Sequence, residues 1–79
     1  MNTPEQAHEL YKTMRNAQGA FTIEFISGTI YKDATSVYDK LQWDENARKG
    51  TGAIETDEGK IFFDFAQVRQ IKIPVTRKL

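Results

Sequence analysis

The stretch FTIEFISGTIYKDATSVYD, residues 21–39, carries the clearest structural pattern in this 79-residue chain. Its first five residues alternate apolar and polar side chains, which is the period of a β-strand with one buried face. The Ser27-Gly28 pair is typical of a tight turn between two antiparallel strands. Residues 29–38 are rich in β-branched and aromatic side chains, and they predict a second strand long enough to bend around a barrel corner.

Residues 3–18, which precede this stretch, predict an amphipathic helix. Thr3 is a favourable N-cap, Pro4 fits the first helical position, and Gln6 completes a capping box with Thr3. Apolar side chains then recur at i, i+3, i+4 and i+7, which gives a single narrow apolar stripe. We therefore expect the helix to lie across the edge of a sheet rather than deep in a core.

Three further short strands are expected after residue 39. The first is predicted to begin near Lys40 and, after an extended loop or bulged excursion at residues 44–52, to resume at residues 53–56. A hairpin turn then leads to a strand at residues 60–65, and a short break leads to the last strand at residues 68–73.

A helix followed by five short, strongly bent antiparallel strands is the element order of a small open barrel. The predicted fold is therefore mainly β, with an N-terminal helix and a five-stranded antiparallel open barrel. The length allows one domain, with the helix at about residues 3–18, the barrel at about residues 20–74 and a loose basic tail at residues 75–79.

The charge balance limits binding to nucleic acid. Eleven basic residues cancel eleven acidic ones, and non-specific duplex binding usually needs a positive excess that releases phosphate counterions. A nucleic-acid site must therefore be local, or be repeated around an assembly. The chain also has no apolar segment near the ~20 residues that span a bilayer and no signal-peptide pattern, which favours a cytoplasmic protein.

Several classes of site are excluded by residue usage. The chain contains no cysteine and one histidine, which excludes disulfides, cysteine-ligated zinc and a histidine-rich metal site. His8 is expected on the exposed side of the helix, with no Ser, Cys or second base to activate. No phosphate-binding glycine motif is present either, so we expect a non-catalytic protein without a metal or cofactor.

Two motifs occur in this order. The first is an apolar strand, a turn glycine and an aromatic-Asp pair, at residues 21–25, Gly28 and Tyr38-Asp39. At the places of a second motif, which is an apolar strand, a basic-Gly turn, Asn-Val and a final apolar strand, the chain has Ile61-Phe62-Phe63, Asp64-Phe65, Gln67-Val68 and Ile71. These motifs resemble those of the Sm-like proteins, the family of Sm, LSm and Hfq. The resemblance covers nearly the whole chain and implies a small barrel of the Sm-like, SH3 type that forms a homo-oligomeric ring and binds single-stranded RNA in RNA metabolism or regulation.

Ring assembly has a physical argument of its own. A chain this short has a marginal core, and without disulfides or metals a partner subunit remains as the means of stabilisation. The last two strands of an open barrel are edges, and an apolar edge pairs readily with another chain. Pairing one edge with the other edge of the next subunit closes a ring if the rotation permits, and the resemblance to Sm-like proteins implies about five to seven members. The expected interface residues are Ile61, Phe62, Phe63, Phe65, Val68, Ile71 and Ile73.

The expected RNA contacts are aromatic and basic residues near the pore of such a ring. An aromatic side chain beside a lysine can stack on bases and hold phosphates, which points to Tyr38, Lys40 and Trp43. The structural alternative places Tyr38 and Trp43 in the barrel core. Arg48 and Lys49 are candidates for contact with the RNA backbone, and their alternative is ordinary solvated charge.

Some positions depart from the RNA-binding pattern of the family. Leu41 and Trp43 stand where the family supplies a base-stacking side chain and a uracil-reading Asn, and Asp64 replaces a basic residue. Asp33 replaces a small residue of the second strand. Two alternatives therefore stay open. One is a protein-binding ring or scaffold of the same fold, phage-encoded or accessory, that has lost uridine recognition, and the other is a monomeric SH3-like module that binds peptide in an aromatic groove.

Overall fold

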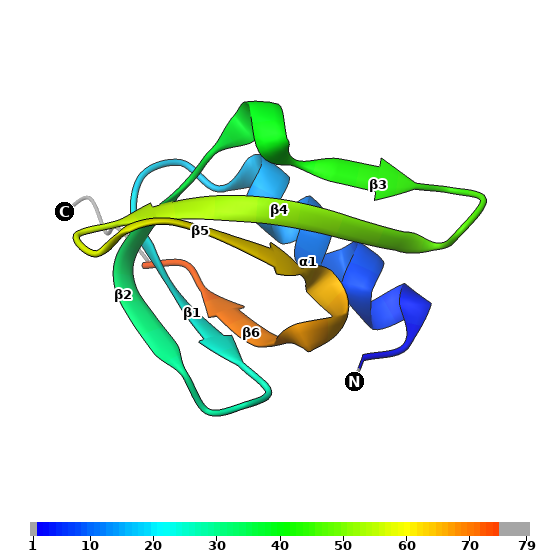
Figure 1. Cartoon of the computed structure of the whole chain (residues 1–79), viewed down its shortest axis with the longest axis horizontal. Coiled ribbons are helices and arrows are strands. Elements are labelled where there is room, and N and C mark those ends of the chain that lie inside the picture. Colours follow the sequence, from blue (N-terminus) through cyan, green and yellow to red (C-terminus); the bar gives the residue numbers. More distant parts are fainter. Residues whose placement is uncertain (1, 75–79) are drawn as a thin grey trace, which may run out of the picture.

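The computed structural model describes residues 2–74, and the expected basic tail at residues 75–79 lies outside the described residues. The described part is mainly β, with one N-terminal helix and a six-stranded antiparallel sheet (Figure 1). The elements in chain order are α1 (Pro4–Asn16), β1 (Phe21–Phe25), β2 (Ile30–Ser36), the 3-10 turn η1 (Tyr38–Lys40), β3 (Gln42–Asp44), β4 (Lys49–Thr56), β5 (Gly59–Asp64), the 3-10 turn η2 (Phe65–Gln67) and β6 (Val68–Lys72).

Helix α1 forms where the capping pattern predicts it. The Thr3 side chain accepts a hydrogen bond from the Gln6 amide at 3.2 Å, and the Gln6 side chain accepts one from the Thr3 amide at 3.0 Å. This reciprocal capping box satisfies two amides that the first helical turn leaves without partners. The buried face of the helix, at Ala7 and Met14, packs against β4, β6 and η2.

The strands follow one another around a curved, open sheet. The path runs β3-β4-β2-β1-β6, and β5 pairs with the other side of β4. Register irregularities in the β1–β2 and β1–β6 ladders mark bulges, which increase local twist and bending. Within the described residues β5 pairs only with β4 and β6 pairs only with β1. The two strands are therefore opposite ends of one sheet.

The prediction for residues 44–52 was wrong, and so was the count of five strands. Only residues 45–48 connect strands: a β3–β4 hairpin pairs Gln42 with Thr51, so that β3 ends at Asp44 and β4 begins at Lys49. The Asp44 carboxylate closes the hairpin turn by accepting hydrogen bonds from the two backbone amides of residues 46 and 47 at 2.9 and 3.0 Å. An aspartate side chain of this kind stabilises a turn against an extended loop.

The second and third predicted strands also differ from the structure around residue 40. The second strand ends at Ser36 instead of continuing to residue 38. Residues 38–40 form η1, because the Lys40 amide donates to the Val37 carbonyl and the Leu41 amide donates to the Tyr38 carbonyl. The third strand therefore begins at Gln42 rather than near Lys40.

A row of aromatic rings crosses the core from one side to the other. The rings of Tyr31, Phe25, Phe63, Phe65 and Tyr11 follow one another with centroid separations of 6.0, 5.4, 5.2 and 5.9 Å. Each pair meets edge to face, which is the favoured arrangement for aromatic quadrupoles. Phe65 is fully buried at the point where the row passes beneath α1.

We predict that Phe65→Ala destabilises the fold by about 3–5 kcal/mol, because it removes a buried ring and leaves a cavity in the row. The matched control is Phe62→Ala, whose ring is 65% exposed and which should cost about 1 kcal/mol or less. Urea unfolding followed by circular dichroism measures both. Equal losses for the two variants would contradict the central place of Phe65.

Candidate functional site

Trp43, which was predicted to stack on RNA bases, does not lie on an open surface. It is half-buried on β3, and its ring lies 4.7 Å from the His8 ring and 5.8 Å from the Tyr11 ring, both on α1. Gly50 lies beneath it, since a Cβ there would come within 2.6 Å of Trp43 Cε3. Helix and strand thus enclose the indole, in agreement with the core alternative.

His8 is a packing residue that the sequence pattern missed. It was expected on the exposed side of the helix, but its ring is half-buried and also stacks on Tyr11 at 6.0 Å. Residues three apart on a helix share a face, so the spacing from His8 to Tyr11 contained this signal. The Trp43 ring, which packs on His8, belongs to a strand more than thirty residues later in the chain, and no local pattern indicates this contact.

Tyr38 is partly exposed and also has a structural contact. Its side chain is 56% exposed, while its hydroxyl donates a hydrogen bond to the carbonyl of Ala17 at the end of α1. The neighbouring Ser36 hydroxyl donates to the Met14 carbonyl at 3.3 Å. These two bonds hold the start of η1 against the end of the helix.

The predicted basic contacts are separated by acidic neighbours. Arg48, in the β3–β4 turn, forms an exposed ion pair with Glu5 of α1. Lys49 is paired across the ladder with Asp44, and Lys40 follows Asp39 in η1. The pKa of Glu5 is lowered first by a hydrogen bond from its own backbone amide and then by the Arg48 guanidinium. Each of these three cations therefore has an acidic residue beside it, in an ion pair, across the ladder or in the sequence.

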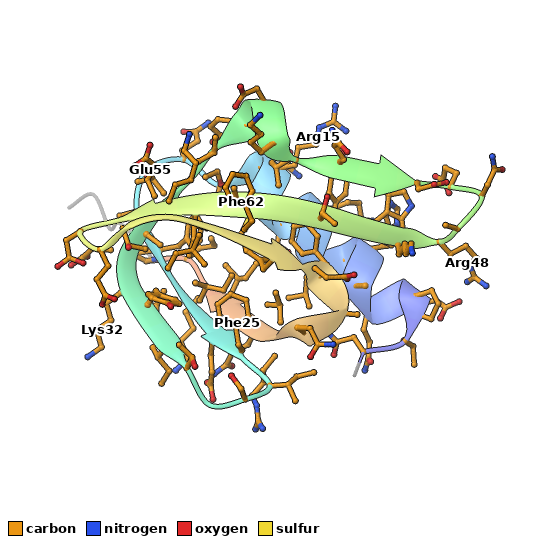
Figure 2. The ribbon with its side chains drawn as sticks, viewed as in Figure 1. Arg15, Phe25, Lys32, Arg48, Glu55 and Phe62 are labelled. Atoms are coloured by element: carbon orange, nitrogen blue, oxygen red, sulfur yellow. The ribbon has the colours of Figure 1, made fainter. Side chains whose placement is uncertain are left out.

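A hollow lies on a different side, at the mouth of the curved sheet. It is an open groove of about 390 Å³ between β5 and the end of the β1–β2 hairpin. Figure 2 shows Phe25 in this opening, well away from Arg48 at the tip of the β3–β4 hairpin. Four aromatic side chains, Phe25, Tyr31, Phe62 and Phe63, line it together with Ser27, Thr29, Ile61, Asp64 and Gln67.

The predicted interface residues divide into core and surface. Phe65 and Val68 are fully buried within the chain, so their side chains belong to its core and not to a surface. Phe62 on β5 is 65% exposed, and Ile73, just after β6, is 39% exposed. The remaining three, Ile61, Phe63 and Ile71, are half-buried.

In residues 2–74, no group of three or more His, Cys, Asp or Glu side chains is placed to hold a metal ion. The helix of this part of the chain is not long and apolar enough to cross a membrane.

We predict that Gly50→Ala destabilises the fold by about 1–3 kcal/mol, because the added methyl overlaps the Trp43 ring and the Gln42 carbonyl. Displacement of the indole from His8 should also shift Trp43 emission to longer wavelength. Thr51→Ala, at an exposed position of the same strand, is the control and should leave the emission unchanged. Unaltered stability and emission in Gly50→Ala would contradict the packing described for Trp43.

We predict that Arg48→Ala raises the pKa of Glu5 part of the way to its ordinary value, since the backbone hydrogen bond remains. A carboxyl with a lowered pKa stabilises the fold above its unfolded-state pKa, and the contribution is lost as the pH falls through the lowered value. NMR titration of the Glu5 side chain measures the shift. Lys49→Ala is the control, and an equal shift in that variant would argue against a specific Arg48 contact.

Comparison of the chain with protein-family models, with curated proteins and with solved structures found no match. The geometry of the described residues is therefore the basis for the function proposed below.

Proposed function

We propose that this chain is a non-catalytic scaffold of the Sm-like barrel type that assembles with copies of itself into a closed homo-oligomer. One observation carries the proposal. The strands β5 and β6 each have a single neighbour and stand at opposite ends of the same sheet. Each end also presents an exposed apolar side chain, Phe62 at β5 and Ile73 at β6.

Unpaired strand edges favour this kind of assembly. A free edge displays backbone N–H and C=O groups in a row, and a second strand can satisfy them. When two different edges of one chain pair, the contact is heterologous, and repetition through a suitable rotation closes a ring. The formal net charge of zero means that copies do not repel one another strongly.

The surroundings of the predicted RNA contacts favour a scaffold over an RNA-binding ring. Trp43 packs against α1 and Arg48 is paired with Glu5, whereas Tyr38 stays 56% exposed although its hydroxyl is bonded to Ala17. Binding to single-stranded RNA depends on accessible aromatic faces beside a cationic track. Lys40 and Lys49 are exposed but have acidic neighbours.

A second candidate is a monomeric module that binds an extended peptide. The observation that favours it is the aromatic groove beside the unpaired edge of β5. An added peptide strand would gain backbone hydrogen bonds from the edge and side-chain contacts from the groove. The mass of the protein in solution separates this candidate from the scaffold.

We predict that light scattering on a sizing column gives a mass of about five to seven subunits for the wild-type chain. Phe62→Asp should reduce this mass, because it places a charge at the β5 edge without removing a core side chain. Ile30→Asp is the control: Ile30 is 51% exposed but lies on the outer side of β2, away from the groove, so the mass should not change. A monomeric wild-type chain would overturn the scaffold and leave the peptide module.

A titration with fluorescently labelled single-stranded RNA tests the competing ring function. The scaffold proposal expects no saturable binding at low salt. Binding that weakens steeply as salt is added would instead support an RNA-binding ring, because phosphate contacts release counterions. Lys40→Ala and Lys49→Ala would then identify which exposed cation contributes.

A further inference from the structure

The groove beside β5 is an open apolar surface that continues the aromatic core. Its floor is one end of the aromatic row, where Phe25 meets Tyr31 at 6.0 Å and Phe63 at 5.4 Å. A strand added to the free edge of β5 would continue the sheet, so its inward side chains would lie over this floor. The occupant should therefore be an extended segment that offers an apolar side chain on its inward face.

The end of β6 offers such a side chain on another copy of the chain. Ile71 faces the core, since it pairs with the buried Ile23 of β1. Ile73 follows two residues later, and side chains two apart on an extended chain point to the same face. Val68 pairs with the buried Phe25 beyond a bulge in the ladder and is fully buried, whereas Ile73 is 39% exposed. Ile73 is thus the inward apolar residue of this strand that is most available to another chain.

The charges of the two edges are complementary. The β5 hairpin carries Asp57, Glu58 and Asp64 against one lysine, Lys60, and Asp64 stands at the rim of the groove. Strand β6 carries Arg69 and Lys72 and no carboxylate. Glu24 of β1 lies 3.7 Å from Arg69 and offsets part of that positive charge. The β5 edge is thus more acidic than the β6 edge. This difference in charge favours contact between β5 of one copy and β6 of another over contact between two β5 edges or two β6 edges.

We propose that Ile73 of one copy fills the aromatic groove beside β5 of the next copy. The inference rests on the proposed self-assembly and names the side chain and the pocket that make it specific. Each copy then has one groove and one inserting residue, and these lie on different edges. The contact is head to tail, and a copy whose groove is empty keeps an exposed aromatic surface.

The test uses two variants that each disable one side of the contact. Thr29→Trp places a large side chain at the exposed rim of the groove and leaves Ile73 intact. Ile73→Asp removes the inserting side chain and leaves the groove intact. Each variant alone should have the mass of a single chain. Mixed in equal amounts they should form a dimer, because the groove of the second accepts Ile73 of the first.

The outcomes separate the inference from the proposed function. A wild-type chain that is itself monomeric overturns both. An oligomeric wild type together with either variant at the wild-type mass, or with a mixture that stays monomeric, overturns only the insertion of Ile73. Far-ultraviolet circular dichroism and urea unfolding verify that each variant is folded, and Ser27→Trp provides a second block of the groove. Ile30→Asp, outside the groove, should keep the wild-type mass.

Discussion

The edge-to-face row of aromatic rings is the contact on which the rest of the structure depends. It joins the β1–β2 hairpin, β5, η2 and α1, which are elements from the first and last parts of the described chain. A chain of 79 residues has little interior. An aromatic ring in it buries more apolar area than a smaller side chain at the same position would. At one end the row is covered by the helix. At the other end it is open to solvent, and that end is the groove.

The two ends of the row suit different functions. On the helix side, Trp43 closes over His8 and Tyr11, and this packing uses the aromatic faces that a base would need. On the open side, Phe25 and Tyr31 are ready to contact an apolar side chain at a free strand edge. The element order that resembles the Sm-like proteins is thus compatible with a scaffold whose ligand contacts differ, because function depends on the site and not on the fold.

Much of the fold was predictable from local patterns, whereas the candidate site was not. The capping box at Thr3, the alternation in β1 and the turn at Gly28 each depend on neighbouring residues, and the structure confirms them. The prediction for residues 44–52 failed because glycine has a low intrinsic preference for strands, so its presence was taken to indicate a loop. In the fold Gly50 makes room for the Trp43 ring, and Gly52 makes room for the rings of Phe63 and Phe65. Such contacts reverse the local preference.

The sequence by itself determined the helix with its capping box, the alternation of β1 and the turn at Gly28, and which site chemistries its residue types exclude. Short-range sterics and hydrogen bonds set these properties, so they can be recognised within a few residues. Only the tertiary structure decided that Trp43 turns towards α1, that Phe25 meets Phe63, and that β5 and β6 have unpaired edges. These features depend on how strongly the sheet bends, which results from packing among side chains far apart in the chain.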